Sequence, residues 1–307
     1  MKKLITAVLV AGMFVSCSEK KVYTKQTYQE GIKAYQSKNY EKAQELLKNT
    51  IYEWKNISIQ EAMAAKFALA DSYFHRKMYI DAIVEFEEYI SMYPTSPKVP
   101  EAIYKLALSY LKIAPSEERD LTYVRTAEQK ATELINDYPD SKYAELAKQI
   151  IKEAKTKEAK HFIKVADLYE HLRKYYSAAV YYNYVYDEFT DYIKRDYIEY
   201  KLAYNLLNVG KQYEKEIEEY EKGIRELEEK IAGSKDLNKK KVYENRKKVL
   251  ENHLKVLKDR IKEGKERGIA ILENAYKMYP KSKYRTKILK LLKKYKEVNN
   301  HRNKRVG

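Results

Sequence analysis

Residues 66–96, KFALADSYFHRKMYIDAIVEFEEYISMYPTS, decide the fold of this chain. Ala70 and Ala82 stand where two amphipathic helices would touch, and aromatic residues surround both positions. Small side chains let two helices approach closely, and aromatic rings fill the gaps around them. Proline in Tyr93-Pro94-Thr95-Ser96 ends the second helix, and Ser96 is placed to cap the next one. The stretch therefore predicts a helical hairpin followed directly by another helix.

The same punctuation recurs as Tyr138-Pro139-Asp140-Ser141-Lys142-Tyr143 and as Tyr279-Pro280-Lys281-Ser282-Lys283-Tyr284. The interior pattern resembles the tetratricopeptide repeat, with a small residue, an aromatic three positions on, an alanine twelve on and a proline twelve further along. The second unit matches fully through Ala70, Tyr73, Ala82 and Pro94. The other units match at Gly31, Tyr40, Ala43 and Leu47; at Ala107, Tyr110, Ala127 and Pro139; at Ala166, Tyr169, Ala178 and Tyr182; and at Leu202, Ala203, Leu272, Ala275 and Pro280.

One helix pair cannot bury its apolar face alone, so several pairs must stack. Scarce glycine (8) and proline (6), with 35% charged residues, also favour long helices. We therefore expect an all-α, tetratricopeptide-repeat superhelix of about five helix pairs. Repeats one to four and the first helix of repeat five are placed at 25–210. The second helix of repeat five and a basic helix are placed at 268–298, with a disordered tail at 299–307.

Residues 211–267 split the fifth repeat. A first apolar series is spaced as a heptad seam, and a second follows after the turn Ala232-Gly233-Ser234-Lys235-Asp236. The two series are Tyr213, Ile217, Tyr220, Ile224, Leu227 and Ile231, and Leu250, Leu254, Leu257 and Ile261. The first arm is acidic and the second basic, so we predict an inserted antiparallel coiled-coil hairpin. A single uninterrupted helix is the alternative, which the Gly-Ser break argues against.

Residues 1–16 have two lysines and then an uncharged, mostly apolar run, which is typical of a signal peptide. The next residue, Cys17, is the only cysteine in the chain. The run Phe14-Val15-Ser16-Cys17 resembles the bacterial lipobox, which implies cleavage before Cys17 and lipidation of its sulfur. Residues 17–24 would then form a lipidated tether, and Ser18 implies onward transport to the outer membrane. The alternative is an ordinary secretory signal with a chance cysteine.

The positive charge of the chain is concentrated at its end. The net charge is +16, of which 269–307 contribute +10, whereas 17–210 are neutral. We predict a basic helix at about 282–298 that docks on an acidic protein face or on anionic lipid. Leu289 and Leu292 are expected to pack inward with Ile288 and Tyr295 beside them. The basic docking face would be Lys287, Lys290, Lys293, Lys294 and Lys296. Nucleic acid is disfavoured outside the cytoplasm, and a merely solvated helix face is the alternative.

The sequence contains no constellation that predicts catalysis. It has no Gly-rich phosphate loop, no cysteine pair and no His-x-x-x-His, and its five histidines are scattered. We expect no enzymatic activity, no cofactor and no metal site.

Helix positions that line the concave groove in tetratricopeptide repeats carry aromatic residues in the first three repeats. These residues are Tyr28, Tyr35, Phe67, Phe74 and Tyr104. Aromatic side chains supply contact area and pocket walls, so the two ladders predict a groove for an extended peptide. The alternative is that the rings pack against neighbouring repeats.

The lipobox, the repeat array, the Tyr-Pro-x-Ser-Lys-Tyr punctuation and an insertion in repeat three together resemble the BamD (ComL) family of outer-membrane assembly lipoproteins. The resemblance covers 14–210 and 268–297. It implies a periplasmic scaffold, lipid-anchored in the outer membrane, that binds the barrel-forming assembly subunit through its C-terminal repeats. It also implies that the N-terminal repeats receive C-terminal segments of unfolded outer-membrane proteins, which typically end in an aromatic residue. The insertion at 211–267 departs from the family pattern.

Two other interpretations remain open. One is a different repeat lipoprotein, such as a coordinator of cell-wall synthesis, although such proteins usually carry a coiled coil before the repeats. The other is a structural role in a secretion or motility complex.

Overall fold

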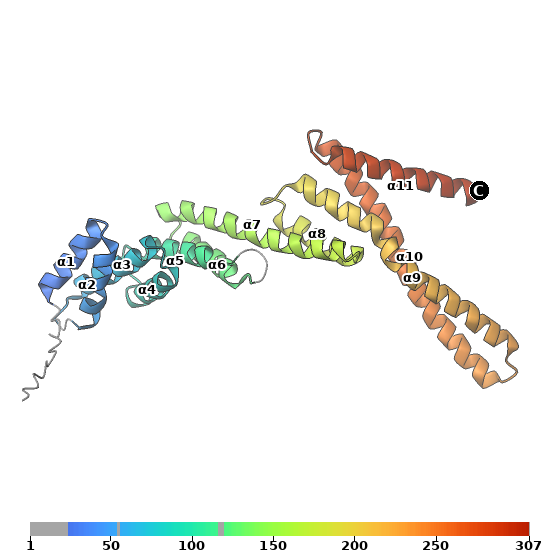
Figure 1. The fold of residues 1–307 in the computed structure, drawn as a ribbon, viewed down its shortest axis with the longest axis horizontal. Coiled ribbons are helices and arrows are strands. Elements are labelled where there is room, and N and C mark those ends of the chain that lie inside the picture. Colours follow the sequence, from blue (N-terminus) through green and yellow to red (C-terminus); the bar gives the residue numbers. More distant parts are fainter. Residues whose placement is uncertain (1–23, 54–55, 116–119, 307) are drawn as a thin grey trace, which may run out of the picture. The chain divides into compact units, whose positions relative to one another are not determined.

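The structure is a computed structural model that describes residues 24–53, 56–115 and 120–306, with side chains through 296. Within these residues the regular structure consists of eleven α-helices and no strand (Figure 1). The prediction of an all-α fold built from helix pairs is confirmed. The predicted signal peptide and the predicted lipidation site at Cys17 lie outside the described residues. None of the helices within them is both long enough and apolar enough to cross a bilayer.

The helices fall into two compact units, Met1–Leu106 and Ala107–Gly307. The first unit holds α1 (Lys25–Gln36), α2 (Tyr40–Glu53), α3 (Ile59–His75), α4 (Tyr79–Met92) and the start of α5 (Val99–Ile113). The second holds the end of α5, α6 (Thr122–Asp137), α7 (Lys142–His171), α8 (Tyr175–Phe189), α9 (Arg195–Gly233), α10 (Leu237–Met278) and α11 (Arg285–Val306). Consecutive helices pack together from α1 to α4 and again from α6 to α11, and α1 also contacts α3.

Three turns between paired helices share one backbone geometry. Lys38, Lys77 and Arg173 have positive φ angles of 61°, 61° and 56°. At each turn the next backbone N–H reaches back five residues, as Met78 does to the Tyr73 carbonyl at 3.0 Å. This is the Schellman arrangement, in which glycine is the usual residue because it adopts a positive φ without strain. Here lysine or arginine takes that position in all three turns.

The Tyr-Pro turns also repeat one hydrogen-bond pattern. The serine oxygens of Ser96, Ser141 and Ser282 accept from the backbone N–H two residues later, at 3.2, 3.2 and 3.0 Å. The serine N–H in turn donates to the tyrosine carbonyl three residues earlier at 3.0–3.1 Å. The predicted serine cap is confirmed for Ser141, which is the N-cap of α7. Ser96 and Ser282 make the same hydrogen bond within the turn, three residues before α5 and α11 begin.

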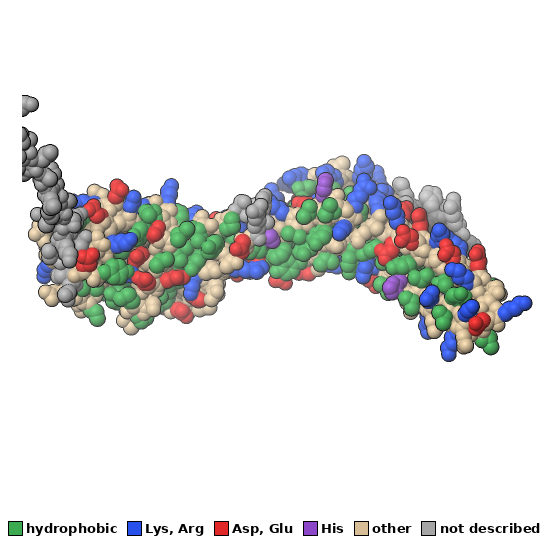
Figure 2. Space-filling view, turned by 60° about the horizontal axis from the view of Figure 1, so that its bottom comes forward, with side chains coloured by type: hydrophobic (Ala, Val, Ile, Leu, Met, Phe, Trp, Pro, Cys, Tyr) green, Lys and Arg blue, Asp and Glu red, His purple; other side chains and the backbone are tan. Residues whose placement is uncertain are grey.

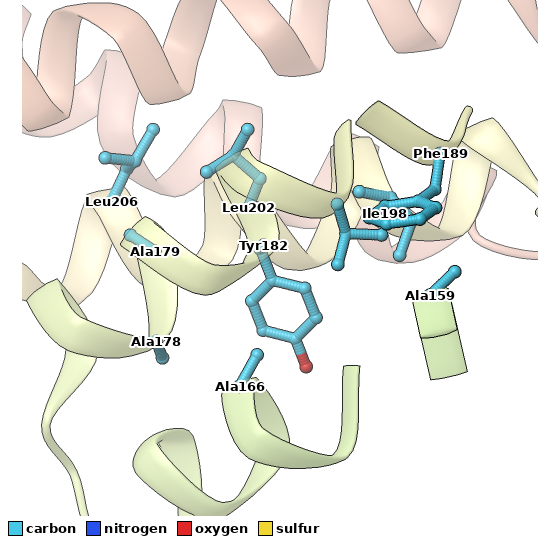
Figure 3. Close-up of a cluster of buried hydrophobic side chains, with 10 residues drawn as sticks. Ala159, Ala166, Ala178, Ala179, Tyr182, Phe189, Ile198, Leu202 and Leu206 are labelled. Atoms are coloured by element: carbon cyan, nitrogen blue, oxygen red, sulfur yellow. The ribbon is translucent and has the colours of Figure 1, made fainter. Parts of the chain in front are cut away.

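The second unit has a core of small and aromatic side chains (Figure 3). The Tyr182 ring of α8 is fully buried and points at Ala166 of α7. Ala178 and Ala179 are nearly fully buried, so α8 lies close against its neighbours. This is the alternation of small contact residues and aromatic fillers that the repeat pattern predicts.

Helices α9 and α10 pack along one another and are separated by residues 234–236. Asp236 caps α10 by accepting from the N–H groups of Asn238 and Lys239 at 2.9 and 3.2 Å. At the base of this hairpin, Gly264 and Gly268 face the backbone of α9. Gly268 stands twelve residues before Pro280, which is the small contact position that the sequence analysis left unassigned in repeat five.

Candidate binding surfaces

A cavity of about 280 Å³ opens in the first unit between α1, α3 and the segment after α4. Its walls are mostly apolar, and Lys98 stands at its edge. The lining residues are Ile32, Tyr35, Gln36, Met63, Ala64, Phe67, Ala68, Tyr89, Ser96, Pro97 and Lys98. In the space-filling view, hydrophobic side chains reach the surface of this unit in patches between acidic and basic ones (Figure 2).

Phe67 forms the inner wall of this cavity. The side chain is only 5% exposed, and its ring meets those of Phe86 and Tyr89 edge-on at 6.2 and 5.4 Å between centroids. The Nζ of Lys98 lies 5.0 Å from the centre of the same ring. Phe67 therefore belongs to the core and to the pocket at once, because one face of its ring is packed and another borders the cavity.

Tyr35, the second predicted groove residue on the wall, is fixed by a carboxylate. Its hydroxyl donates to Asp71 at 2.6 Å, and Lys105 contacts the same carboxylate at 2.5 Å and Glu101 at 2.7 Å. Burial, and then the hydrogen bond to Asp71, raises the pKa of Tyr35 well above its usual value. The hydroxyl therefore stays a proton donor, and the charges beside it are already paired.

An equivalent ion pair joins consecutive first helices in the second unit. Lys201 of α9 contacts Asp167 and Glu170 of α7 at 2.9 and 2.8 Å. Asp71 and Asp167 each follow the small contact residue of their repeat, and the lysine lies two positions before the small residue of the next. Burial alone would lower the pKa of Lys201, but the two carboxylates raise it above its usual value. Consecutive first helices are thus connected by charged contacts at equivalent positions of the repeat.

The other three predicted groove residues are not among those lining the cavity. Phe74 is half-buried and meets Tyr79 and Phe86 edge-on at 5.8 and 6.5 Å. Tyr28 and Tyr104 are half-buried as well, and burial raises the pKa of Tyr28. The ladders therefore divide: Tyr35 and Phe67 border an open pocket, whereas Phe74 packs within its own helix pair.

The sequence analysis missed Lys98, Met63 and Tyr89 as residues of this pocket. Tyr89 and Lys98 are brought there by the turn after α4, where the hydroxyls of Tyr89 and Ser96 are 2.5 Å apart. The available signal was the Ser-Pro-Lys run at 96–98, which directly follows the Tyr-Pro punctuation.

The first unit also contains a buried lysine. Lys66 is 1% exposed, lies 2.6 Å from Glu85, and contacts Glu88 and the Tyr52 hydroxyl, the latter at 3.2 Å. Burial alone would lower the pKa of Lys66, but the carboxylates of Glu85 and Glu88 raise it above its usual value. This cluster connects α2, α3 and α4, and its charges are satisfied internally.

Helix α11 is anchored differently from the prediction. Ile288 and Leu292 are buried against Ala203, Leu207, Leu272 and Ala275, whereas Leu289 is 36% exposed. The expectation that Leu289 packs inward was wrong: spacings of three and of four residues both keep two side chains on one helix face, and the contacts with α9 and α10 bury Ile288 beside Leu292 instead. The helix begins at Arg285 and continues past 298, with Ser282 in the preceding turn.

The five lysines of the predicted docking face are all exposed. Lys287 lies 5.8 Å from the Tyr200 ring, Lys294 lies 5.4 Å from the Tyr295 ring, and Lys296 forms an ion pair with Glu273 at 2.5 Å. Lys290 and Lys293 have no ion-pair partner among the described side chains. This face is therefore open to solvent, and part of its charge is unpaired. Within the described residues no group of histidine, cysteine and carboxylate side chains could hold a metal ion.

The helix pairs, their turns and the small contact residues place the chain in the class of tetratricopeptide-type helical-repeat proteins. A family model described as an outer membrane lipoprotein, YfiO, matches residues 20–219. The chain therefore belongs to the YfiO family of outer membrane lipoproteins, and the resemblance to the BamD family is confirmed. The family match ends within α9, before the turn of the hairpin.

A relative from Aquifex aeolicus, named "Putative outer membrane protein assembly factor BamD", is 31% identical over 223 residues. The alignment covers 71% of this chain and 73% of that protein. Among solved structures, the Rap protein complexed with competence and sporulation factor is 15% identical, covers 88% of this chain and 74% of that chain, and gives a TM-score of 0.30. That similarity is too weak to inform the fold or the function.

Proposed function

We propose that this chain is a scaffold subunit of the machinery that assembles β-barrel proteins in the outer membrane, working from the periplasmic face. The observation that carries the proposal is the family match, together with a relative that is named for outer membrane protein assembly and aligned over most of both chains. Pull-down of the barrel-forming subunit from solubilised membranes tests it. Recovery of cell-wall synthases in its place would favour a coordinator of envelope construction.

The anchor of this scaffold is a lipid on Cys17. Cys17 follows a small residue and an apolar run, and it is the only sulfhydryl in the chain. Several acyl chains on one residue give stable membrane attachment, whereas one alone does not. Cys17→Ser is expected to leave the protein uncleaved or soluble. Unchanged mass and unchanged outer-membrane fractionation of this variant would contradict the lipid anchor.

The pocket of Tyr35 and Phe67 receives the terminal aromatic side chain of an unfolded barrel protein. Its volume of about 280 Å³ is at the lower end for ligand pockets, which suits one bulky side chain better than a whole small molecule. Lys98 lies at the edge of the pocket with its side chain 54% exposed, and its Nζ forms an ion pair with Glu101 at 2.8 Å. A terminal carboxylate would share this ammonium group with Glu101. A peptide ending in phenylalanine would thus place its ring in the pocket and its carboxylate near Lys98.

Peptides that end in phenylalanine with a free or an amidated C-terminus test this arrangement. Lys98→Gln is expected to weaken binding of the free-acid peptide about tenfold and to leave the amidated peptide nearly unaffected. Phe74→Ala is the matched control, because the Phe74 ring packs outside the cavity. This variant should lower the melting temperature of the protein and leave its affinity for both peptides nearly unchanged. Equal loss for both peptides in Lys98→Gln would exclude carboxylate recognition at this site.

The exposed lysines of α11 form the contact with the barrel-forming subunit. Lys287, Lys290, Lys293, Lys294 and Lys296 are all solvent-accessible, and the buried pair Ile288 and Leu292 holds the helix in place beneath them. Replacing the five lysines with glutamine should weaken or slow association with that subunit or with anionic vesicles while the protein stays folded. Salt should weaken the wild-type interaction as well. Association that is equally strong in the mutant and independent of salt would leave α11 as a solvated cap.

A further inference from the structure

Helix α10 carries a second seam on the side that faces solvent. Its members are asparagine and valine in strict alternation with the 4-3 spacing of a coiled coil. They are Asn238, Val242, Asn245, Val249, Asn252 and Val256. The three valines are 48%, 53% and 55% exposed, and the three asparagines are exposed too. The seam spans almost three heptads, or roughly 27 Å of helix.

This outer seam is not required by the hairpin itself. The inner contacts of α10 come from Leu250, Leu254, Leu257 and Ile261, of which Leu257 is buried. With about 100° of rotation per residue, the outer seam points more than 90° away from them. Valine loses side-chain freedom in a helix, so an exposed helix face without a partner gains nothing from it. Three valines at intervals of seven therefore need a reason other than the contact with α9.

Two rows of basic residues flank the outer seam, again at intervals of seven. One row is Lys239, Arg246, His253 and Arg260, and the other is Lys241, Lys248, Lys255 and Lys262. In a coiled coil these flanking positions choose the partner by charge. In the first row, His253 and Arg260 contact Tyr220 and Tyr213 of α9. Lys239, Arg246 and the four lysines of the second row would therefore be the charges that acidic residues of a second helix meet.

The lysines of α10 divide into paired and unpaired sets. Lys247 and Lys258, beside the inner seam, contact Glu228 and Glu221 of α9 at 2.7 and 2.9 Å. Lys248, Lys255 and Lys262 of the outer row are exposed, and within the described side chains no ion pair engages them. The acidic arm of the hairpin thus neutralises the inner lysines and leaves the outer ones available.

We propose that the outer seam of α10 is a docking site for an acidic amphipathic helix of another protein, which would form a second coiled-coil contact along α10, on the side away from α9. Asparagine at core positions favours asparagine on the partner and so fixes the register, and valine favours an apolar partner. Glutamate or aspartate at the flanking positions of the incoming helix would pair with the two basic rows.

Other occupants fit this surface less well. A second copy would bring its own basic rows against these if α10 met α10. The outward side of α9, with Lys215, Glu218, Lys222, Glu226 and Glu229, has no apolar seam to offer. A lipid surface would have to accommodate an asparagine in every second turn of the apolar stripe, which is costly in a medium without hydrogen-bond partners.

The seam leads into a cavity at the base of the hairpin. This cavity has a volume of about 470 Å³ and is bordered by apolar Tyr176, Leu206, Val209 and Val256 and by charged Asp259, Arg260, Glu263 and Arg267. Arg260 closes one side, because its guanidinium stacks 4.2 Å from the Tyr176 ring and donates to the Tyr213 hydroxyl at 3.0 Å. A side chain near the end of the docked helix would meet both apolar and charged groups here, which continues the contact beyond the last valine.

The test uses the full mature chain in detergent and two fluorescent peptides of four heptads. Both carry asparagine and valine at the seam positions, and one has glutamate and the other lysine at both flanks. We expect the acidic peptide to bind, with an affinity that falls as salt rises, and the basic peptide not to bind. Val242→Ser, Val249→Ser and Val256→Ser together should weaken binding at least tenfold. Circular dichroism should show unchanged helicity, because all three sites are exposed.

A charge exchange makes the test independent of the valines. Lys248→Glu with Lys255→Glu should weaken binding of the acidic peptide and allow the basic peptide to bind. The matched control, Lys215→Glu with Lys222→Glu on the outward side of α9, makes the same change in net charge and should leave the preference unaltered. Three results would overturn the proposal: no discrimination between the peptides, anionic vesicles binding through the valines without peptide binding, or self-association that the valine substitutions abolish. The surface lies almost wholly beyond the family match and does not depend on the function proposed above.

Discussion

Alanine at position 268 tests how closely α10 approaches α9 at the base of the hairpin. A Cβ atom there would lie 2.9 Å from Cγ of Leu207 and 3.2 Å from the carbonyl oxygen of Ala203. Leu207 is 3% exposed and sits in the cluster with Leu272 and Ile288, so its side chain has little room to move. The added methyl group must therefore displace α10 or distort the packing of Leu207.

The expected magnitude follows from two opposing effects. Gly→Ala in a helix stabilises by about 1 kcal/mol through backbone propensity. Overpacking a close contact costs about 1–3 kcal/mol. Gly268→Ala should therefore be between neutral and roughly 2 kcal/mol less stable. Gly210→Ala on the same interface is the control, since its Cβ would be 3.5 Å from Ile261 in ordinary contact, and it should gain about 1 kcal/mol.

Urea denaturation measures the free energy of unfolding of both variants, and we expect Gly268→Ala to be about 1–3 kcal/mol less stable than Gly210→Ala. Because a chain with two compact units need not unfold in one step, hydrogen exchange in α9 and α10 should accompany it. Faster exchange at the base of the hairpin in Gly268→Ala, but not in Gly210→Ala, would localise the effect. Equal stabilisation by the two substitutions would refute the close approach of the helices.

Three further predictions concern turns and buried charges. Lys66→Ala would leave Glu85 without its cation and should lower the free energy of unfolding by about 3 kcal/mol, measured by thermal or urea unfolding. This is at the lower end for buried ion pairs because Glu88 is half-exposed. A smaller loss of stability in Lys66→Ala than in Lys66→Met would argue against this explanation. Lys77→Gly should stabilise by about 0.5–1 kcal/mol, since φ is 61° there, whereas Lys77→Ala should not. Glu199 is 2% exposed, and burial raises its pKa although Tyr279 donates to it at 3.2 Å. A folded-state pKa above the unfolded value of about 4.3 means that the free energy of unfolding falls as pH rises between the two. Glu199→Gln removes this titration, so its melting temperature should fall less than that of the wild type as pH rises above about 4; an identical pH profile would disprove this.

Burial is the main cause of the raised pKa of both Glu199 and its hydrogen-bond partner Tyr279. Burial, and then the charge of Glu199, raises the pKa of Tyr279 to about 12. Tyr279 begins the last Tyr-Pro turn, so this turn motif also places a proton donor against the buried carboxyl group of Glu199. The hydroxyl remains protonated throughout the physiological range and can keep donating.

Much of the fold could be predicted from the sequence because its signals are local. Proline stops a helix by its own geometry, serine caps the next one through a neighbouring N–H, and small residues at fixed intervals need no knowledge of distant segments. The heptad spacing on both sides of residues 232–236 likewise specifies two helices that turn back on each other. For this reason the sequence alone predicts the turns at Ser96, Ser141 and Ser282 and the helix cap at Ser141.

Only the tertiary structure decided how the groove and α11 are built. The aromatic ladder looks uniform in sequence, yet Phe67 lines a cavity and Phe74 packs on Tyr79, because the turn after α4 brings Tyr89 and Lys98 to one of them alone. Leu289 and Ile288 are adjacent and equally apolar, and the choice between them depends on the angle at which α11 meets α10. Burial is a property of what lies opposite a side chain, and periodicity within one helix cannot specify that.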